Sequence, residues 1–322
     1  MADPLQIARR IADERLAPLA AAVDRDQRFS EDLWREVFDF GLPGIPFPSE
    51  LGGGGGSFRE YCDVIEAFAR RAAITTTYHA PAVLVATALA DFSPALADGL
   101  VTPILTGSRR VCWAFTEPQT GSDPRQIATR VRRAGDEWVL DGEKAFITLA
   151  SLADHALVFA RDDRDRLNAV LVDTDQPGWQ AAEPLEFMAF GGGATGSVFL
   201  DGVTAPLDRL IGDPGQGFEI MLRGEAAGKI RASATCVGIA QRALELAVQY
   251  AREREHRGEP IGTKFQTIQW LLGEIGAAVE AARALAQEAA RTPHNPLDVP
   301  PHSPGARHRG APCDRSKERL AP

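Results

Sequence analysis

Cysteine is scarce in this sequence, and its few cysteines do not indicate a metal site. The 322 residues include 4 cysteines: Cys62, Cys112, Cys236 and Cys313. No two of them form a Cys-x-x-Cys pair, and none has a histidine at the spacing that zinc sites use. We therefore expect no metal site and interpret the cysteines as single buried thiols.

The sequence also lacks a long apolar run and an excess of positive charge. No apolar stretch approaches the roughly 18–20 residues that a membrane span needs. Charged residues interrupt the N-terminal segment, so it does not form the apolar core of a signal peptide. With 35 Lys+Arg against 44 Asp+Glu, the net charge is −9, which disfavours broad binding to nucleic acid. We expect a cytoplasmic protein that binds neither nucleic acid nor a membrane.

The composition changes sharply at about residue 290. Residues 291–322 contain 7 of the 22 prolines and 3 of the 6 histidines, and their net charge is +3 against −12 for the rest. No apolar periodicity survives there, so this segment cannot bury enough surface to offset its conformational entropy. We predict a disordered tail over 291–322.

The first of three remaining stretches, residues 1–110, has the pattern of a helical domain. Apolar residues near the N-terminus recur at about every 3.6 positions. Ser30, followed by two acidic residues, is suited to cap a helix that Gly41 closes. The runs 61–71 and 80–89 have the composition of further buried helices.

The next two stretches differ in period. Residues 111–206 contain short β-like runs separated by Gly, Pro and Asp turns, which predicts a small β-barrel or sandwich. Among these runs, 137–140 and 145–148 are expected as separate strands on either side of a turn at Asp141-Gly142. Residues 207–290 return to helix, with two long segments, 217–254 and 265–290, that indicate a helical hairpin. The predicted fold class is therefore α+β and multidomain, with an all-α N-terminal domain, a small β-barrel and an incomplete C-terminal helical bundle.

The densest functional signal is the segment 113–123, with the sequence Trp-Ala-Phe-Thr-Glu-Pro-Gln-Thr-Gly-Ser-Asp. Here a strand runs into a turn whose hydroxyl and backbone donors can face an anionic or carbonyl-rich ligand. This segment resembles the signature of the acyl-CoA dehydrogenase flavoproteins. The resemblance continues in order through 140–148, 187–218 and 237–258, and it covers about residues 5 to 290.

The resemblance implies an enzyme that binds FAD between the barrel and the helical bundle. The implied reaction is α,β-desaturation of an acyl thioester on CoA or on an acyl carrier protein. In it a carboxylate removes the α-proton while the β-hydride passes to flavin N5, and donors on the thioester carbonyl stabilise the enolate-like charge. The implied partners are the acyl thioester, an electron-transfer flavoprotein or another acceptor, and further copies of the chain in a homo-oligomer.

The resemblance also assigns site residues by position. Trp113, Phe115 and Thr116 line the flavin ring, Phe146 packs on it and Thr148 donates near N5. Ser122 meets the flavin phosphate or the acyl-carrier side, and Arg254 pairs with the pyrophosphate of a neighbouring subunit's FAD, for which a guanidinium fork is suited. The complete implied set is Trp113, Phe115, Thr116, Ser122, Phe146, Ile147, Thr148 and Arg254 for the cofactor, and Ser122 and Lys229 for the substrate.

The sequence departs from the family at the catalytic base. Most members carry the catalytic glutamate past the helical hairpin, where this chain shows no counterpart, and we expect a truncated or frameshifted C-terminus. A minority carry it on the first bundle helix, at the position of Gly228. Glu225, one turn earlier, is the remaining candidate for the base.

Three functions therefore stay open. The first is an acyl thioester dehydrogenase. The second is a catalytically impaired or partner-dependent member of the family. The third is an oxidase or flavin monooxygenase on the same fold. The sequence does not indicate which acyl group is bound.

Overall fold

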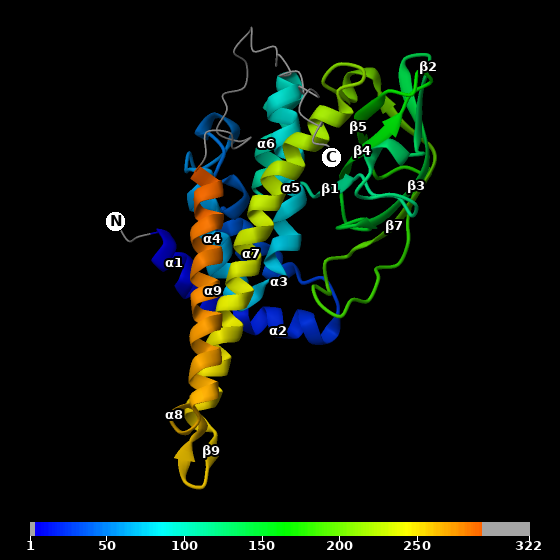
Figure 1. The fold of residues 1–322 in the computed structure, drawn as a ribbon. Helices are drawn as coiled ribbons and strands as arrows, with labels where there is room; N and C mark the ends of the chain where they lie inside the picture. Colours follow the sequence, from blue (N-terminus) through cyan, green and yellow to red (C-terminus); the bar gives the residue numbers. More distant parts are fainter. Residues whose placement is uncertain (1–3, 292–322) are drawn as a thin grey trace, which may run out of the picture.

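The computed structural model describes residues 4–291, so the tail predicted over 291–322 lies outside the described residues except for Arg291, the last residue of the final helix (Figure 1). Helices fill the first third of the chain, as predicted. Ser30 Oγ accepts from the Leu33 N–H at 3.2 Å and caps the third helix, and Gly41 follows that helix with a φ of +79°. The helices are α1 (Pro4–Ile11), which continues through a π-helical turn (Ala12–Leu16), α2 (Ala17–Asp26), α3 (Glu31–Asp39), α4 (Phe58–Ala72), α5 (Thr75–Phe92) and α6 (Pro94–Leu105).

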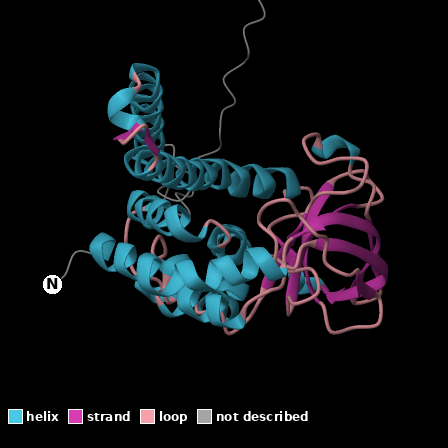
Figure 2. Cartoon of the chain, turned by 90° about the horizontal axis from the view of Figure 1, so that it is seen from below, coloured by secondary structure: helices cyan, strands magenta, loops and turns pink. Residues whose placement is uncertain are grey.

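The middle of the chain forms one curved sheet of eight strands beside the helices (Figure 2). Its hydrogen-bonded order is β6-β7-β3-β2-β4-β5-β8, and β1 pairs in parallel with β4. The strands are β1 (Val111–Ala114), β2 (Arg130–Ala134), β3 (Glu137–Ile147), β4 (His155–Arg161), β5 (Leu167–Asp173), β6 (Trp179–Ala181), β7 (Gly196–Pro206) and β8 (Leu210–Ile211).

One part of the strand prediction is wrong. The runs 137–140 and 145–148 were expected as separate strands around a turn at Asp141-Gly142, but they form the single strand β3. The register against β7 shifts between Leu140 and Gly142, which marks a β-bulge. A Cβ at Gly142 would lie 2.6 Å from Thr129 Oγ1, so the glycine permits the close approach of β2 rather than a chain reversal.

Strands β4 and β5 have two buried faces, which explains why they read as continuous apolar runs. On one face, Val158 and Val170 join the core enclosed by the curved sheet. On the other face, Phe159 and Leu171 join the core shared with the helices. The sheet is thereby fixed against the helical domain.

The C-terminal part forms the predicted helical hairpin. Helix α7 (Gly217–Glu253) starts beside the sheet, passes α5 and α4 and extends beyond the N-terminal helices, and α9 (Gln266–Arg291) returns alongside it (Figure 1). A Cβ at Gly238 would lie 2.5 Å from the Glu66 carbonyl oxygen, so α7 and α4 touch backbone to backbone. Between the helices lie the strands β9 (Glu255–His256) and β10 (Glu259–Pro260) and the short α8 (Ile261–Lys264).

Two other findings bear on the sequence predictions. Cys62 and Cys112 are buried as expected, but Cys236 is exposed, because the adjacent Thr235 is the residue of α7 that faces α5. Cys313 lies outside the described residues. Among residues 4–291, no helix combines the length and the apolar character that a membrane crossing requires.

Candidate functional site

Two segments that are distant in the sequence lie side by side at one edge of the sheet. The Ala145 N–H donates to the Thr116 carbonyl oxygen at 2.9 Å, which joins the end of β1 to the end of β3. We call residues 113–116 and 145–148 together the β1–β3 wall. The wall brings together six of the predicted cofactor residues: Trp113, Phe115, Thr116, Phe146, Ile147 and Thr148.

A buried ion pair holds this wall in register. Lys144 Nζ lies 2.8 Å from Glu117 Oε1, and the two side chains are 0% and 1% exposed. The same ammonium group donates to the carbonyl oxygens of Phe115 at 3.2 Å and Phe159 at 2.6 Å. Lys144 therefore ties together β1, β3 and β4, and all three of its protons are used.

Glu117 fixes the loop that follows β1. Its carboxylate accepts from the backbone N–H groups of Ala128 at 2.7 Å and Thr129 at 3.0 Å, in addition to Lys144. Burial alone would raise the pKa of Glu117, but the Lys144 charge and these hydrogen bonds lower it to about 2. Burial lowers the pKa of Lys144 to about 8 against the pull of Glu117, so both groups are charged at neutral pH.

The aromatic residues of the wall differ in their surroundings. Trp113 packs on Phe159 with ring centroids 4.7 Å apart, and its Nε1–H is buried without a hydrogen-bond partner among the described residues. A Cβ at Gly224 would lie 3.0 Å from the Trp113 ring, so α7 passes directly over it. Phe146 instead has a φ of +57°, and the residue is 61% exposed. A left-handed backbone is unfavourable for a phenylalanine, and such strain is commonly kept where a side chain meets a ligand.

The two threonines of the wall are half-buried. Thr148 Oγ1 accepts a long hydrogen bond of 3.4 Å from Thr195, which leaves its own proton for another acceptor. The Thr116 hydroxyl makes no hydrogen bond within residues 4–291. The other predicted residues contribute less to this surface, because Ile147 points into the core of the sheet, Phe115 packs on Phe159, and Ser122 lies exposed in the following loop.

On α7, close to the wall, position 228 is a glycine and therefore carries no acidic side chain. A Cβ at Gly228 would meet only the Arg231 Nη2 atom, at 3.8 Å, so the position has room for a side chain. Glu225 is half-buried and Lys229 is exposed. The chain thus places its nearest predicted acid, Glu225, one turn away from the expected position.

Arg254 lies far from the other predicted site residues. It caps the C-terminal end of α7, while Trp113 touches the same helix at Gly224. Thirty residues of helix at 1.5 Å each separate these two points by about 45 Å. Arg254 therefore does not reach the wall of its own chain.

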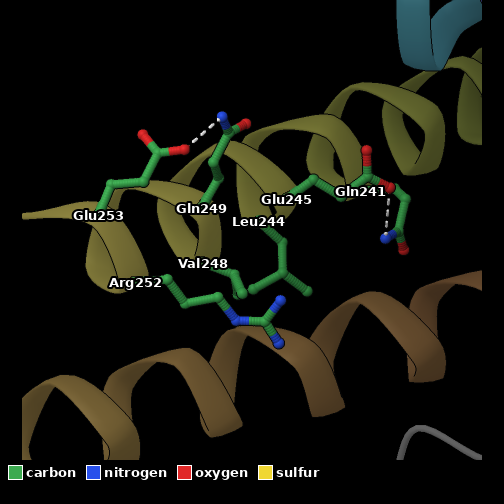
Figure 3. A pocket seen from close by; sticks show the side chains of 7 residues that line it. All are labelled: Gln241, Leu244, Glu245, Val248, Gln249, Arg252 and Glu253. Carbon is green, nitrogen blue, oxygen red and sulfur yellow. Dashed lines mark hydrogen bonds between the residues drawn. The ribbon is translucent and has the colours of Figure 1, made fainter. Parts of the chain in front are cut away.

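A surface groove on the hairpin is separate from the wall. It has a volume of about 480 Å³, and Figure 3 shows Leu244, Val248 and Arg252 reaching toward α9 while Gln249 and Glu253 lie on the opposite side of α7. None of the predicted site residues lines it. Among residues 4–291 there is also no cluster of three or more His, Cys, Asp or Glu side chains arranged to hold a metal ion.

Sequence reasoning missed four polar residues of this region. Glu117 and Lys144 stand inside the two recognised motifs, and a buried lysine in a strand needs a partner, so this pair could have been found from the sequence. The other two, His79 and Arg231, stand in helical stretches without a recognisable motif. Their proximity arises only from the packing of α5 against α7.

His79 is buried as a neutral imidazole. Its Nδ1 lies 2.8 Å from the Thr75 carbonyl oxygen, so Nδ1 carries the proton, and Nε2 has no partner among the described residues. Burial, with a smaller effect of the Arg231 charge, lowers the pKa of His79 to about 3. The folded chain therefore excludes a proton that the unfolded chain binds below pH 6.5.

We expect His79 to contribute to the pH dependence of the free energy of unfolding. The free energy of unfolding should fall as the pH drops from about 6.5 toward 3, by about 2–3 kcal/mol between pH 7 and pH 4.5. His79→Phe keeps a ring and removes the titrating group, so its loss over this range should be smaller by that amount. Urea unfolding of the native chain and of His79→Phe at pH 7 and pH 4.5 measures how much free energy of unfolding each protein loses. Both proteins contain Glu117, so its contribution cancels when the two losses are compared. Equal losses would contradict the prediction.

Comparison with known proteins gives consistent matches along the chain. Residues 5–108, 112–203 and 215–306 match the family models described as the N-terminal, middle and C-terminal domains of acyl-CoA dehydrogenase. The probable acyl-CoA dehydrogenase YngJ of Bacillus subtilis (strain 168) is 34% identical over 292 residues, which are 88% of this chain and 77% of the relative.

Two further proteins are similar over most of their length. The human mitochondrial short-chain specific acyl-CoA dehydrogenase is 34% identical over 297 residues, which are 90% of this chain and 72% of the relative. The solved structure of a glutaryl-coenzyme A dehydrogenase with glutaryl-CoA superposes with a TM-score of 0.85 at 30% identity, covering 89% of this chain and 75% of that one.

Proposed function

Because the chain belongs to the acyl-CoA dehydrogenase family, whose members are flavin oxidoreductases that bind FAD, we propose that it binds FAD and desaturates an acyl thioester between its α and β carbons. The observation that carries this proposal is the β1–β3 wall, in which the hydrogen bond from Ala145 to Thr116 joins the two recognised motifs. We propose the same domain limits as the sequence analysis: 1–110, 111–206 and 207–290.

The wall fits a planar, hydrogen-bonding ring system. It offers an exposed ring at Phe146, a buried Trp113 N–H without a protein partner and two threonine hydroxyls with protons to donate. A buried donor without a partner is costly, so a ligand acceptor at this point stabilises the site. In this proposal Trp113, Thr116, Phe146 and Thr148 contact the flavin ring, and Ser122 lies at the phosphate or carrier end. Phe115 and Ile147 belong to the same wall but support it from the core side.

When bound, FAD supplies the acceptor for the hydride that leaves the β-carbon. The residues of the chain orient the reactants and exclude water. Thr116 and Thr148 donate to the polar edge of the ring, and Trp113 together with Gly224 closes the seam between the sheet and α7. The ion pair of Lys144 with Glu117 holds these donors at fixed positions, which matters because misplaced donors lose most of their effect.

Removal of the α-proton needs a base, and this step favours a second candidate function. Gly228 provides no carboxylate, and Glu225 is one turn away. The observation that only Arg231 lies within 4 Å of a Cβ at Gly228 supports a catalytically impaired chain, or one that receives its base from a partner. In the active alternative, Glu225 is the base, while Lys229 and Ser122 contact the substrate.

The position of Arg254 supports assembly into a homo-oligomer. Since it lies about 45 Å along α7 from its own wall, it can pair with an FAD pyrophosphate only on a second copy of the chain. Exposed apolar side chains on the hairpin, including Tyr250, Trp270 and Leu285, are consistent with such an assembly. We further propose an electron-transfer flavoprotein as the electron acceptor.

An absorbance spectrum of the purified chain, followed by titration with acyl-CoA without oxygen, tests the proposal. Bound flavin that bleaches on addition of butyryl-CoA supports the dehydrogenase. Bound flavin that never bleaches with acyl-CoA or acyl carrier protein thioesters supports the impaired chain, and protein that binds no FAD overturns both. Reoxidation by electron-transfer flavoprotein rather than by oxygen distinguishes a dehydrogenase from an oxidase or monooxygenase.

A further inference from the structure

Arg231 is a half-buried guanidinium group without a carboxylate partner. It lies on α7, and its one side-chain hydrogen bond within residues 4–291 is a long contact of 3.5 Å from Nη1 to the Thr76 carbonyl oxygen. A guanidinium group has five N–H donors. Most of these donors therefore have no protein acceptor in the described part of the chain.

Two other arginines in the same helical interface each have a carboxylate partner. Arg223, two turns earlier on α7, lies 2.6 Å from the Asp91 carboxylate of α5. Arg283 on α9 lies 2.7 Å from Glu66 of α4 and also contacts Gln241. Arg231 differs from both, because no carboxylate among the described residues pairs with it.

The surroundings of Arg231 are polar but contain no free acid. Thr76 and Thr235 hydroxyls lie 3.0 Å apart beside it, and Tyr61 and His79 present a hydroxyl and an Nε2 that are buried and unpartnered among the described residues. The charge of Arg231 acts on the pKa values of Tyr61, Cys62 and His79, so these groups share its field. The acids of α4 are committed elsewhere, Asp63 to Arg59 and Glu66 to Arg283.

The guanidinium group also adjoins the proposed reaction centre. Its Nη2 lies 3.8 Å from the Cβ position of Gly228. By the family resemblance, this is the position at which a minority of members carry the base that removes the α-proton. A substrate whose α-carbon lies beside Gly228 extends its acyl chain past Arg231. A purely apolar acyl chain packed against this cation would desolvate it without providing a counter-charge, which costs binding free energy.

We propose that Arg231 binds a carboxylate on the acyl group, so that the substrate is a short dicarboxylic acyl thioester. This inference rests on the proposed function. The guanidinium group donates two parallel hydrogen bonds to the carboxylate. Thr76, Thr235 and Tyr61 supply hydroxyl groups around it. Arg231 is then a residue that determines specificity rather than a base.

Calorimetric titration of the full chain, purified with FAD, tests this proposal with two ligands of equal length. Glutaryl-pantetheine and pentanoyl-pantetheine differ only in a terminal carboxylate against a methyl group, and their pantetheine arm is common to CoA and carrier proteins. We expect the native chain to bind the glutaryl ligand at least tenfold more tightly. Arg231→Met should remove this preference and leave pentanoyl affinity within about twofold, and Arg231→Lys should keep part of the preference.

Arg252→Met is the matched control, since Arg252 is an exposed arginine on the same helix and should leave the preference unchanged. Equal binding of the two ligands by the native chain overturns the dicarboxylate proposal but not the proposed function. A loss of both affinities in Arg231→Met, with Arg231→Lys equally weak, also overturns it. Failure of both ligands to bind the native chain overturns the proposed function and this inference together.

Discussion

Lys144→Met is expected to lower the free energy of unfolding by about 3–5 kcal/mol, because it leaves the buried carboxylate of Glu117 without its counter-charge. The methionine preserves much of the side-chain volume, so the loss reports the charge rather than a cavity. Without the ammonium group, the Phe115 and Phe159 carbonyl oxygens also lose a donor. Urea unfolding at pH 7 measures the change, and weaker FAD binding should accompany it because the β1–β3 wall loosens.

Two matched variants separate the ion pair from general disruption. Adding Glu117→Gln to Lys144→Met removes the unpaired charge and should recover part of the stability, although the Ala128 and Thr129 N–H groups then meet a weaker acceptor. Arg125→Met breaks the exposed contact with Asp123 and should leave the stability close to that of the native chain, because solvent screens this pair. A single Lys144→Met variant as stable as the native chain would show that the pair contributes nothing.

Gly228→Glu is expected to raise the rate of acyl thioester desaturation by about 10²-fold, since a positioned general base contributes 10²–10⁴-fold. The expected gain lies at the lower end because Arg231 lies beside the new carboxylate, lowers its pKa and weakens it as a base. Adding Arg231→Met should therefore raise the rate further when butyryl-CoA is the substrate. Single-turnover bleaching of the flavin without oxygen measures the chemical step.

Gly273→Glu is the control for the added charge. Gly273 lies exposed on α9, and a Cβ there meets nothing within 4 Å, so this variant should leave the rate unchanged. A native chain that already turns over quickly, together with no gain in Gly228→Glu, would assign the base elsewhere. Loss of that activity in Glu225→Gln would then identify Glu225 as the base.

Local sequence signals determined most of the elements of this fold. As predicted, α3 begins after the Ser30 cap and ends before Gly41, which has a left-handed backbone. These ends are predictable because capping and a positive φ each depend on only one or two residues. The apolar runs of β4 and β5, and the two long helices of the hairpin, also follow from residues close together in the chain. The motifs at 113–123 and 140–148 were sufficient to indicate the family.

Tertiary structure alone decided how these segments meet. The sequence 137–147 suggests two strands and a turn, but pairing with β2 and β7 makes it one strand with a bulge at Gly142. The ion pair of Glu117 with Lys144 requires β1 beside β3, and the contact of Arg231 with the Thr76 carbonyl oxygen requires α7 to pack against α5. Side chains 27 or more residues apart are brought into contact by the burial of apolar surface, which has no direction along the chain.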